Sequence, residues 1–181
     1  MDYRVIKTND SADLQCLWNA YASDVSHLYR DMPEMEIQSK FIDSTDEYEI
    51  VTYVAYELEQ LIGFCSGVWV KESDILYLTF VLVDINYQRK GIGTKLLKLT
   101  EDALLRKTSL KRIDIVFFNP IHLEWIIPET ASMDHPNLPG IDIKGEGYSF
   151  FKHHKYHEFA TQNAYYKNIE MYEYSDIVLE K

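Results

Sequence analysis

The sequence has few cysteines that could form disulfide bonds and no long apolar run that could insert into a membrane. Two cysteines, Cys16 and Cys65, are too few for a disulfide framework or a cysteine-rich zinc site, and we interpret both as small buried residues in a reducing compartment. The longest apolar run covers nine residues, 75–83, and is too short to cross a bilayer. The N-terminal segment becomes polar at once, so no secretion signal is expected. These absences predict a cytoplasmic protein without a membrane segment.

Basic residues are also in deficit, with 18 Lys and Arg against 29 Asp and Glu and a net charge of −11. Such a balance argues against a general nucleic-acid binder. The charges are uneven, because residues 86–112 hold eight bases and two acids, whereas residues 31–49 hold seven acids and one lysine. We therefore expect an anion near the first stretch. A cation near the second is a hypothesis, and solvated surface is the alternative for either stretch.

The residues that are present suit one packed domain over 1–181, because 46% of the 181 residues are hydrophobic and 14% are aromatic. Apolar periodicity predicts a helix from about residue 10 to 28, with Trp18, Tyr21 and Tyr29 as core, and a shorter helix near 37–42. β-rich runs predict a first strand and then three consecutive antiparallel strands, at 3–8, 49–57, 61–70 and 75–83. The last of these is nearly all apolar, which favours a central place in the sheet.

The second half predicts a different organisation. A helix over 94–107 followed by a strand over 111–118 completes a strand–helix–strand unit with parallel strands. Residues 119–147 then hold four of the five prolines and three of the seven glycines. We expect a long ordered loop there, and loops of that length are usually functional. A short helix over 148–155 and a final pair of strands over 159–174 end the chain.

The stretch YQRKGIGTKLLKL, residues 87–99, joins an apolar strand to a helix through two glycines and two cations. The first N–H groups of a helix lack partners and carry a partial positive charge, and glycines let a phosphate approach them. The spacing does not match a Walker A loop, and Gly-Ile-Gly has no third glycine for a dinucleotide fingerprint. The pattern by itself indicates an anion site without naming the anion.

In its context, this stretch resembles the acetyl-CoA signature of the GNAT family of N-acetyltransferases, Q/R-x-x-G-x-G/A, with Gln88, Gly91 and Gly93 at the fixed positions. The resemblance extends to the order of elements over nearly the whole chain. YSFFKHHKYHEF, residues 148–159, is similar to the next helix of that family. The implied fold is a single α/β (α+β) domain. Its mixed, mostly antiparallel sheet is flanked by helices, with a long loop between the fifth strand and the following helix.

The resemblance implies that acetyl-CoA or CoA binds as co-substrate, with no metal. A main-chain N–H near Leu82 would polarise the thioester carbonyl, and the strand residues Leu82 and Val83 would pair with the pantetheine arm. The residues implied to contact the cofactor are Val81, Leu82, Val83, Gln88, Arg89, Lys90, Gly91, Ile92, Gly93, Thr94, Asn119 and Phe151.

The catalytic positions depart from the family pattern. The usual tyrosine acid aligns with Phe151, which has no proton to donate, and Tyr148 one turn earlier is a substitute. Thr79 stands where many members carry a glutamate base. Replacements come from the long loop, with His122 and Glu124 as candidates and further acidic or imidazole side chains at Glu129, Asp134 and His135. The histidines 153, 154 and 157 lack the companions of a zinc site.

The function implied is acetyl transfer from acetyl-CoA to an amine by direct attack. The acceptor is a small molecule or peptide, and the acids of residues 31–49 favour a cationic one. The alternative is a catalytically silent acyl-CoA sensor or interaction module of the same fold, suggested by the missing tyrosine, and O- or thio-acyl transfer stays open. A homodimer is also left open, and no nucleic acid or membrane partner is expected.

Overall fold

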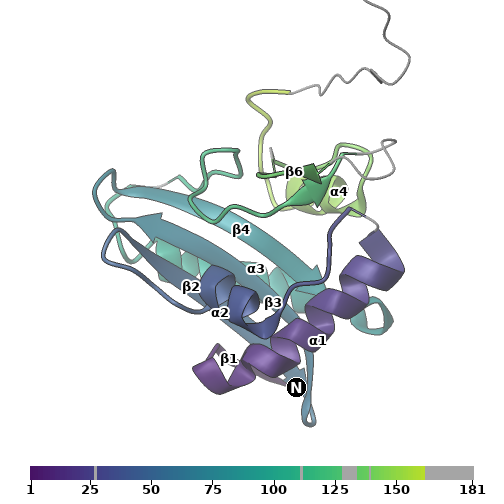
Figure 1. The fold of residues 1–181 in the computed structure, drawn as a ribbon. Coiled ribbons are helices and arrows are strands. Elements are labelled where there is room, and N and C mark those ends of the chain that lie inside the picture. Colours follow the sequence, from purple (N-terminus) through teal and green to yellow (C-terminus); the bar gives the residue numbers. More distant parts are fainter. Residues whose placement is uncertain (27, 111, 128–133, 139, 162–181) are drawn as a thin grey trace, which may run out of the picture.

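Four antiparallel strands form the sheet that carries the other elements (Figure 1). The computed structural model describes residues 1–26, 28–110, 112–127, 134–138 and 140–161. The strands of the sheet are β1 (Asp2–Val5), β2 (Tyr48–Glu57), β3 (Gln60–Val70) and β4 (Ile75–Val83), paired in that order. The three predicted consecutive strands are confirmed to within one residue at each end.

The helices lie on both faces of this sheet, with α1 and α2 on one face and α3 on the other (Figure 1). The helical elements are η1 (Thr8–Asp10), α1 (Ser11–Tyr21), η2 (Ala22–Ser26), α2 (Glu34–Phe41), η3 (Ile85–Tyr87), α3 (Ile92–Leu104) and α4 (Glu146–His153). The first helix ends earlier than predicted, because η2 continues the chain as a π-helical turn. Within the described ranges, no helix is long and apolar enough to span a membrane.

The predicted strand over 111–118 is wrong. Within the described residues 112–118, Asp114 alone makes a bridge, parallel to Tyr77 of β4. The N–H of Asn119 bonds the carbonyl of Val116 at 3.2 Å, so the chain turns before an extended partner for β4 can form. The direction of this bridge is parallel, as the predicted strand–helix–strand unit requires, but the unit lacks its second strand. Among the described residues, β4 is correspondingly the last strand of its sheet rather than a central one.

The long loop over 119–147 contains a small sheet of its own. Its strands are β5 (Trp125–Ile126) and β6 (Asp134–His135), which pair antiparallel. The N–H of Ile126 bonds the carbonyl of Leu28 at 2.7 Å, which joins this loop to the segment after α1. Of the predicted final strands, residues 159–161 lie outside any helix or strand, and residues 162–174 lie outside the described residues.

Aromatic rings fill the core between the sheet and α1. Trp18 is fully buried and its ring lies 5.6 Å from Phe41 and 5.0 Å from Phe80, centroid to centroid. Phe64 of β3 contacts both phenylalanines. Trp18 and Tyr29 are buried as predicted, and Tyr21 is partly buried against the same cluster.

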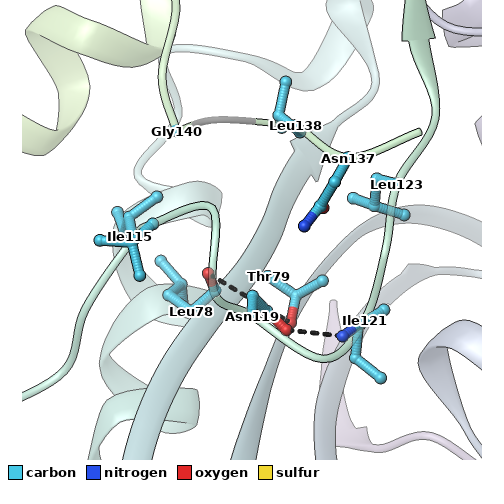
Figure 2. A pocket seen from close by; sticks show the side chains of 10 residues that line it. Leu78, Thr79, Ile115, Asn119, Ile121, Leu123, Asn137, Leu138 and Gly140 are labelled. Carbon is cyan, nitrogen blue, oxygen red and sulfur yellow. Dashed lines mark hydrogen bonds between the residues drawn. The ribbon is translucent and has the colours of Figure 1, made fainter. Parts of the chain in front are cut away.

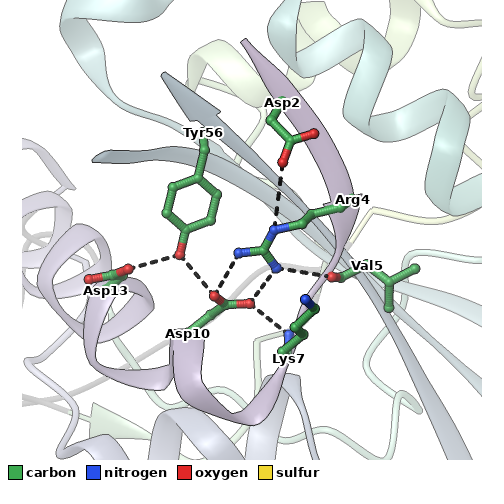
Figure 3. Close-up of polar contacts among 7 residues, drawn as sticks. All are labelled: Asp2, Arg4, Val5, Lys7, Asp10, Asp13 and Tyr56. Carbon is green, nitrogen blue, oxygen red and sulfur yellow. Dashed lines mark hydrogen bonds and ion pairs between the residues drawn. The ribbon is translucent and has the colours of Figure 1, made fainter. Parts of the chain in front are cut away.

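A polar network ties the first strand to α1 and β2 (Figure 3). The guanidinium of Arg4 donates two hydrogen bonds to the Asp10 carboxylate, at 2.7 and 2.8 Å. The Lys7 N–H and the Tyr56 hydroxyl also donate to this carboxylate, and Tyr56 contacts Asp13 as well. Asp10 is buried, and the Arg4 partner lowers the pKa of its carboxyl. This network stabilises the ionised form of Asp10 in the folded protein.

Candidate active site

The two halves of β4 have different neighbours. In residues 75–78, which we call the paired half, the Leu78 N–H bonds the Asp114 carbonyl at 2.9 Å, and the Asp114 N–H bonds the Leu76 carbonyl at 3.0 Å. Residues 79–83, the open half, pair with β3 alone among the described residues. The strand therefore offers an edge to a ligand only in its second half.

A bulge separates the two halves. The β3–β4 register jumps from Gly67 opposite Leu78 to Ser66 opposite Phe80, which leaves Thr79 without an opposite residue. A bulge of this kind shifts the alternation of backbone groups by one residue. Before the bulge, Leu76 and Leu78 direct their backbone groups away from β3. After it, the residues that do so are odd-numbered instead of even-numbered.

The direction of those groups follows from three contacts. A Cβ placed on Gly63 would lie 2.9 Å from the Leu82 carbonyl oxygen, so that carbonyl points toward β3. The Asp84 N–H also bonds β3, at the Ile62 carbonyl. Because backbone groups alternate along a strand, those of Val81 and Val83 point away from β3. The Val83 carbonyl indeed accepts a hydrogen bond from the Gln88 side chain at 3.0 Å.

A small cavity of about 20 Å³, with three polar side chains among apolar ones, lies where the chain after Asp114 turns away from β4 (Figure 2). Thr79 and Asn119 line it from opposite segments, with Asn137 on a third side. The Asn119 amide donates to the Thr79 hydroxyl at 3.1 Å, and its carbonyl oxygen accepts from the Ile121 N–H at 2.9 Å. Asn119 therefore holds the turn against β4, and the cavity has room for about one water molecule.

The start of α3 lies just beyond the open half. Gly91 has φ of +79°, and a Cβ placed there would meet nothing within 4 Å. The first α-helical hydrogen bond runs from the Lys95 N–H to the Gly91 carbonyl, so the N–H groups of the first turn stay available. Arg89 and Lys90 are exposed beside them. This arrangement is an open, positively polarised cradle suited to phosphate.

One face of α4 covers this cradle. A Cβ on Gly93 would lie 3.4 Å from the Phe150 ring, and one turn later His154 Nε2 lies 3.0 Å from the Thr94 hydroxyl. One turn earlier, Glu146 lies 3.8 Å from the Arg89 guanidinium, as an exposed pair. The helix thus presents positions 146, 150 and 154 to the start of α3.

The geometry agrees with the family comparison. The model of the acetyltransferase (GNAT) family matches residues 15–120, which is more than half of the chain. The chain belongs to this family. A search of curated protein sequences finds no significant match.

Solved structures show the same GNAT fold at low sequence identity. An aminoglycoside acetyltransferase, meta-AAC0020 from an uncultured soil metagenomic sample, is 15% identical with a TM-score of 0.60, over 92% of this chain and 95% of that one. A ribosomal-protein-alanine N-acetyltransferase from Brucella melitensis is 12% identical with a TM-score of 0.59, over 92% and 98%. The aminoglycoside 6'-N-acetyltransferase AAC(6')-Ig from Acinetobacter haemolyticus is 14% identical with a TM-score of 0.56, over 94% and 100%.

The structure does not bring the predicted catalytic side chains together at the open half. The Tyr148 hydroxyl donates to the Glu158 carboxylate, and that bond raises the pKa of Tyr148. His122 and Glu124 are exposed, whereas the alternate residues Ile121 and Leu123 are buried at the cavity. Tyr148, His122 and Glu124 therefore stay predictions without geometric support.

The other loop candidates are engaged elsewhere. Asp134 forms a bidentate pair with Arg30, and the His135 ring contacts the Asn137 backbone. Glu129 lies outside the described residues. In the described part of the chain, no group of three or more His, Cys, Asp or Glu residues is placed to hold a metal ion.

The acidic side chains of residues 31–49 form hydrogen bonds and ion pairs with partners in different parts of the fold. Glu34 accepts from the Ser11 hydroxyl, Glu36 pairs with Lys40 at 3.4 Å, and Glu49 pairs with Lys107 at 2.7 Å. Lys107 follows the C-terminal end of α3, opposite to the cradle at its start. The stretch is therefore not a single carboxylate wall.

Sequence reasoning named Phe151 but missed the contacts of Phe150, in α4, and of His154, directly after it, with the start of α3. Phe151 packs instead beside Tyr156, with ring centroids 5.2 Å apart. The spacing of 146, 150 and 154 by four residues was the signal that could have identified this helix face. The cofactor contact of Phe151 stays a prediction.

Proposed function

We propose that this GNAT-family chain is an N-acetyltransferase that moves an acetyl group from acetyl-CoA to an amine. One observation carries the proposal: the open half of β4 leads directly to the N-terminus of α3, where the first helical N–H groups lack intrahelical partners. An extended ligand arm could add to the strand edge while its phosphates meet the first helical N–H groups.

The residues present fit such a co-substrate. The backbone groups of Val81 and Val83 point away from β3, toward the place where an amide-containing arm would lie, and the Val83 carbonyl already accepts a hydrogen bond from the Gln88 side chain. At the cradle, the absence of any atom within 4 Å of a Cβ on Gly91 leaves room for a phosphate. Arg89 and Lys90 add positive charge. The contacts implied for Gln88, Ile92, Gly93 and Thr94 belong to the same cradle.

The main-chain donor to the oxyanion is one residue away from Leu82, the residue that the sequence suggested. Acetyl-CoA, when bound, supplies the thioester that an amine attacks. Leu82 directs its carbonyl toward β3, so the neighbouring Val81 N–H is the donor that faces an edge ligand. A main-chain donor held rigidly in a sheet stabilises the oxyanion without reorganisation. We therefore assign this role to Val81 in place of Leu82.

Calorimetric titration with CoA tests the site. Gly91→Glu places a carboxylate and its bulk in the cradle, and we expect CoA to bind about 100-fold more weakly, a loss of about 2.7 kcal/mol. Gly91→Ala is the matched control, because it carries the same backbone strain at positive φ without the charge. Unchanged CoA affinity in Gly91→Glu refutes the phosphate site.

Turnover is measured separately, as CoA released from acetyl-CoA with and without a panel of polyamines, aminoglycosides, amino acids and peptide N-termini. We expect at least one amine to accelerate release above the rate with water alone. If CoA binds but no amine of the panel accelerates release, the proposal of amine acetylation is overturned, and the acyl-CoA sensor and O- or thio-acyl transfer are the readings that are left.

A further inference from the structure

The cavity beside the bulge lies at the end of the open half of β4 that is farther from the cradle. The start of α3 follows Val83, the last residue of β4, whereas Thr79, the first residue of the open half, lines the cavity. At Leu78 the edge of the strand is closed, because the Leu78 N–H bonds the Asp114 carbonyl at 2.9 Å. An extended arm whose phosphates lie in the cradle therefore runs back along β4 and ends at this cavity.

The spacing along the strand suits such an arm. Thr79 and Val83 are four positions apart in β4, a span of about 13 Å at about 3.3 Å per residue. Val81, the proposed donor to the thioester carbonyl, is two positions and about 7 Å from Thr79. Since the methyl carbon of an acetyl group is one bond from the carbonyl carbon, a thioester bonded at Val81 can direct its acyl group into the cavity.

Apolar side chains from three segments close this cavity (Figure 2). One segment is β4 itself, the second is the chain that turns away from it after Asp114, and the third is the long loop. The apolar side chains that line the cavity are those of Leu78, Ile115, Val116, Ile121, Leu123 and Leu138. Leu78, Ile121 and Leu123 are buried in the core, and Leu138 is partly buried against it. The cavity therefore has walls on the side away from the cradle.

The polar side chains of the cavity are bonded to the chain around it. Asn119 donates to the Thr79 hydroxyl and accepts from the Ile121 N–H, and the Asn137 amide donates to the Phe117 carbonyl. The space that is left, about 20 Å³, takes one small group such as a methyl, which is only slightly larger than a water molecule. A longer chain would have to displace a wall of a closely packed interior.

We propose that this cavity receives the methyl group of the acyl chain and restricts the protein to two-carbon acyl groups, with Ile121, Leu123 and Leu138 as the long-loop residues that set the limit. The inference rests on the proposed acetyl transfer and adds which acyl-CoA the site accepts. The long loop thus has a role at the acyl end of the co-substrate.

Calorimetric titration with CoA, acetyl-CoA, propionyl-CoA and butyryl-CoA tests this inference without an acceptor. For wild-type protein we expect propionyl-CoA to bind about 10-fold more weakly than acetyl-CoA, and butyryl-CoA more weakly still, because each added methylene must displace a wall. Leu138→Ala shortens one wall to a single methyl group and should bring propionyl-CoA to within about threefold of acetyl-CoA. Ile121→Val removes one methyl group and should shift the ratio in the same direction by a smaller factor.

Leu105→Ala is the matched control. Leu105 is also partly buried, but it packs at the C-terminal end of α3 and does not line the cavity. The control should keep the wild-type ratio of propionyl-CoA to acetyl-CoA affinity. The ratio is the informative quantity, because a loss of stability weakens the binding of every acyl-CoA alike, whereas a larger cavity favours the longer chain.

Two results overturn the inference. Equal binding of acetyl-CoA and butyryl-CoA by wild-type protein means that the acyl group lies outside the cavity. A wild-type ratio in both cavity variants means that the cavity is closed to the ligand and holds only a water molecule, and if Leu138→Ala does not fold, Ile121→Val decides. Failure of the proposed function is distinguishable, because wild-type protein would then bind none of the four ligands, CoA included.

Discussion

The two halves of β4 have similar composition and opposite roles. Both are almost wholly apolar, yet the paired half is bonded on both edges and the open half on one. The difference comes from Thr79, which has no opposite residue, and from Asn119, which holds the departing chain in a turn. One strand of nine residues thus has a half that is paired on both sides and a half that leaves one edge available. The hydrophobicity of the sequence alone does not show which half is paired on both edges and which on one.

The glycines on each side of this division should respond differently to substitution. A Cβ on Gly67, in the paired region, would lie 2.7 Å from both the Tyr77 carbonyl and Leu104. We expect Gly67→Val to lower the free energy of unfolding by about 3 kcal/mol, because backbone must move. Urea denaturation measures the loss.

Gly93→Val is the matched variant beside the open half, where a Cβ would make only ordinary contacts with Phe150 and Val83. We expect its stability to stay within about 1 kcal/mol of wild type while CoA binding weakens. Equal destabilisation of the two variants contradicts the distinction between the halves.

We expect Asn119 to hold the turn by which the chain after Asp114 leaves β4. Asn119→Ala removes the bonds to Thr79 and to the Ile121 N–H and leaves buried groups unsatisfied, so the free energy of unfolding should fall by about 2 kcal/mol. Thermal and urea denaturation measure it. The exposed Asn86→Ala is the control and should change stability by less than about 0.5 kcal/mol. A stability unchanged in Asn119→Ala means that the turn holds without this side chain.

The Asp10 network, on the sheet edge opposite to β4, should give the protein an acid-sensitive component of stability. Because Arg4 lowers the pKa of Asp10 in the folded state, this stability is present above the unfolded pKa of about 3.9 and is lost as pH falls through the folded pKa. Asp10→Asn should cost about 1.5 kcal/mol at neutral pH.

Melting temperatures from pH 6 to pH 2.5 check this expectation. The Asp10→Asn variant should lose less stability than wild type over the acid range, since the titrating group is gone. Parallel pH profiles for the two proteins show that the acid sensitivity arises elsewhere.

The smallest expected effect is at the end of α4, the helix that flanks the open half. Lys155 has φ of +66°, a conformation that glycine adopts without strain. Lys155→Gly should raise the free energy of unfolding by about 0.5–1 kcal/mol without changing CoA affinity. Lys152→Gly, inside the helix, is the opposite control and should destabilise by a similar amount. A destabilised Lys155→Gly shows that the lysine side chain makes a contact that outweighs the strain.

Local pattern determined much of this protein. Alternating and continuous apolar runs predicted β2, β3 and β4 to within a residue, because strand periodicity depends on neighbouring side chains. The spacing of Gln88, Gly91 and Gly93 placed the cradle at the start of α3 for the same reason. Tertiary structure decided what long-range pairing controls. The bulge at Thr79 exchanged Leu82 for Val81 at the free edge, and the turn at Asn119 replaced the strand expected over 111–118.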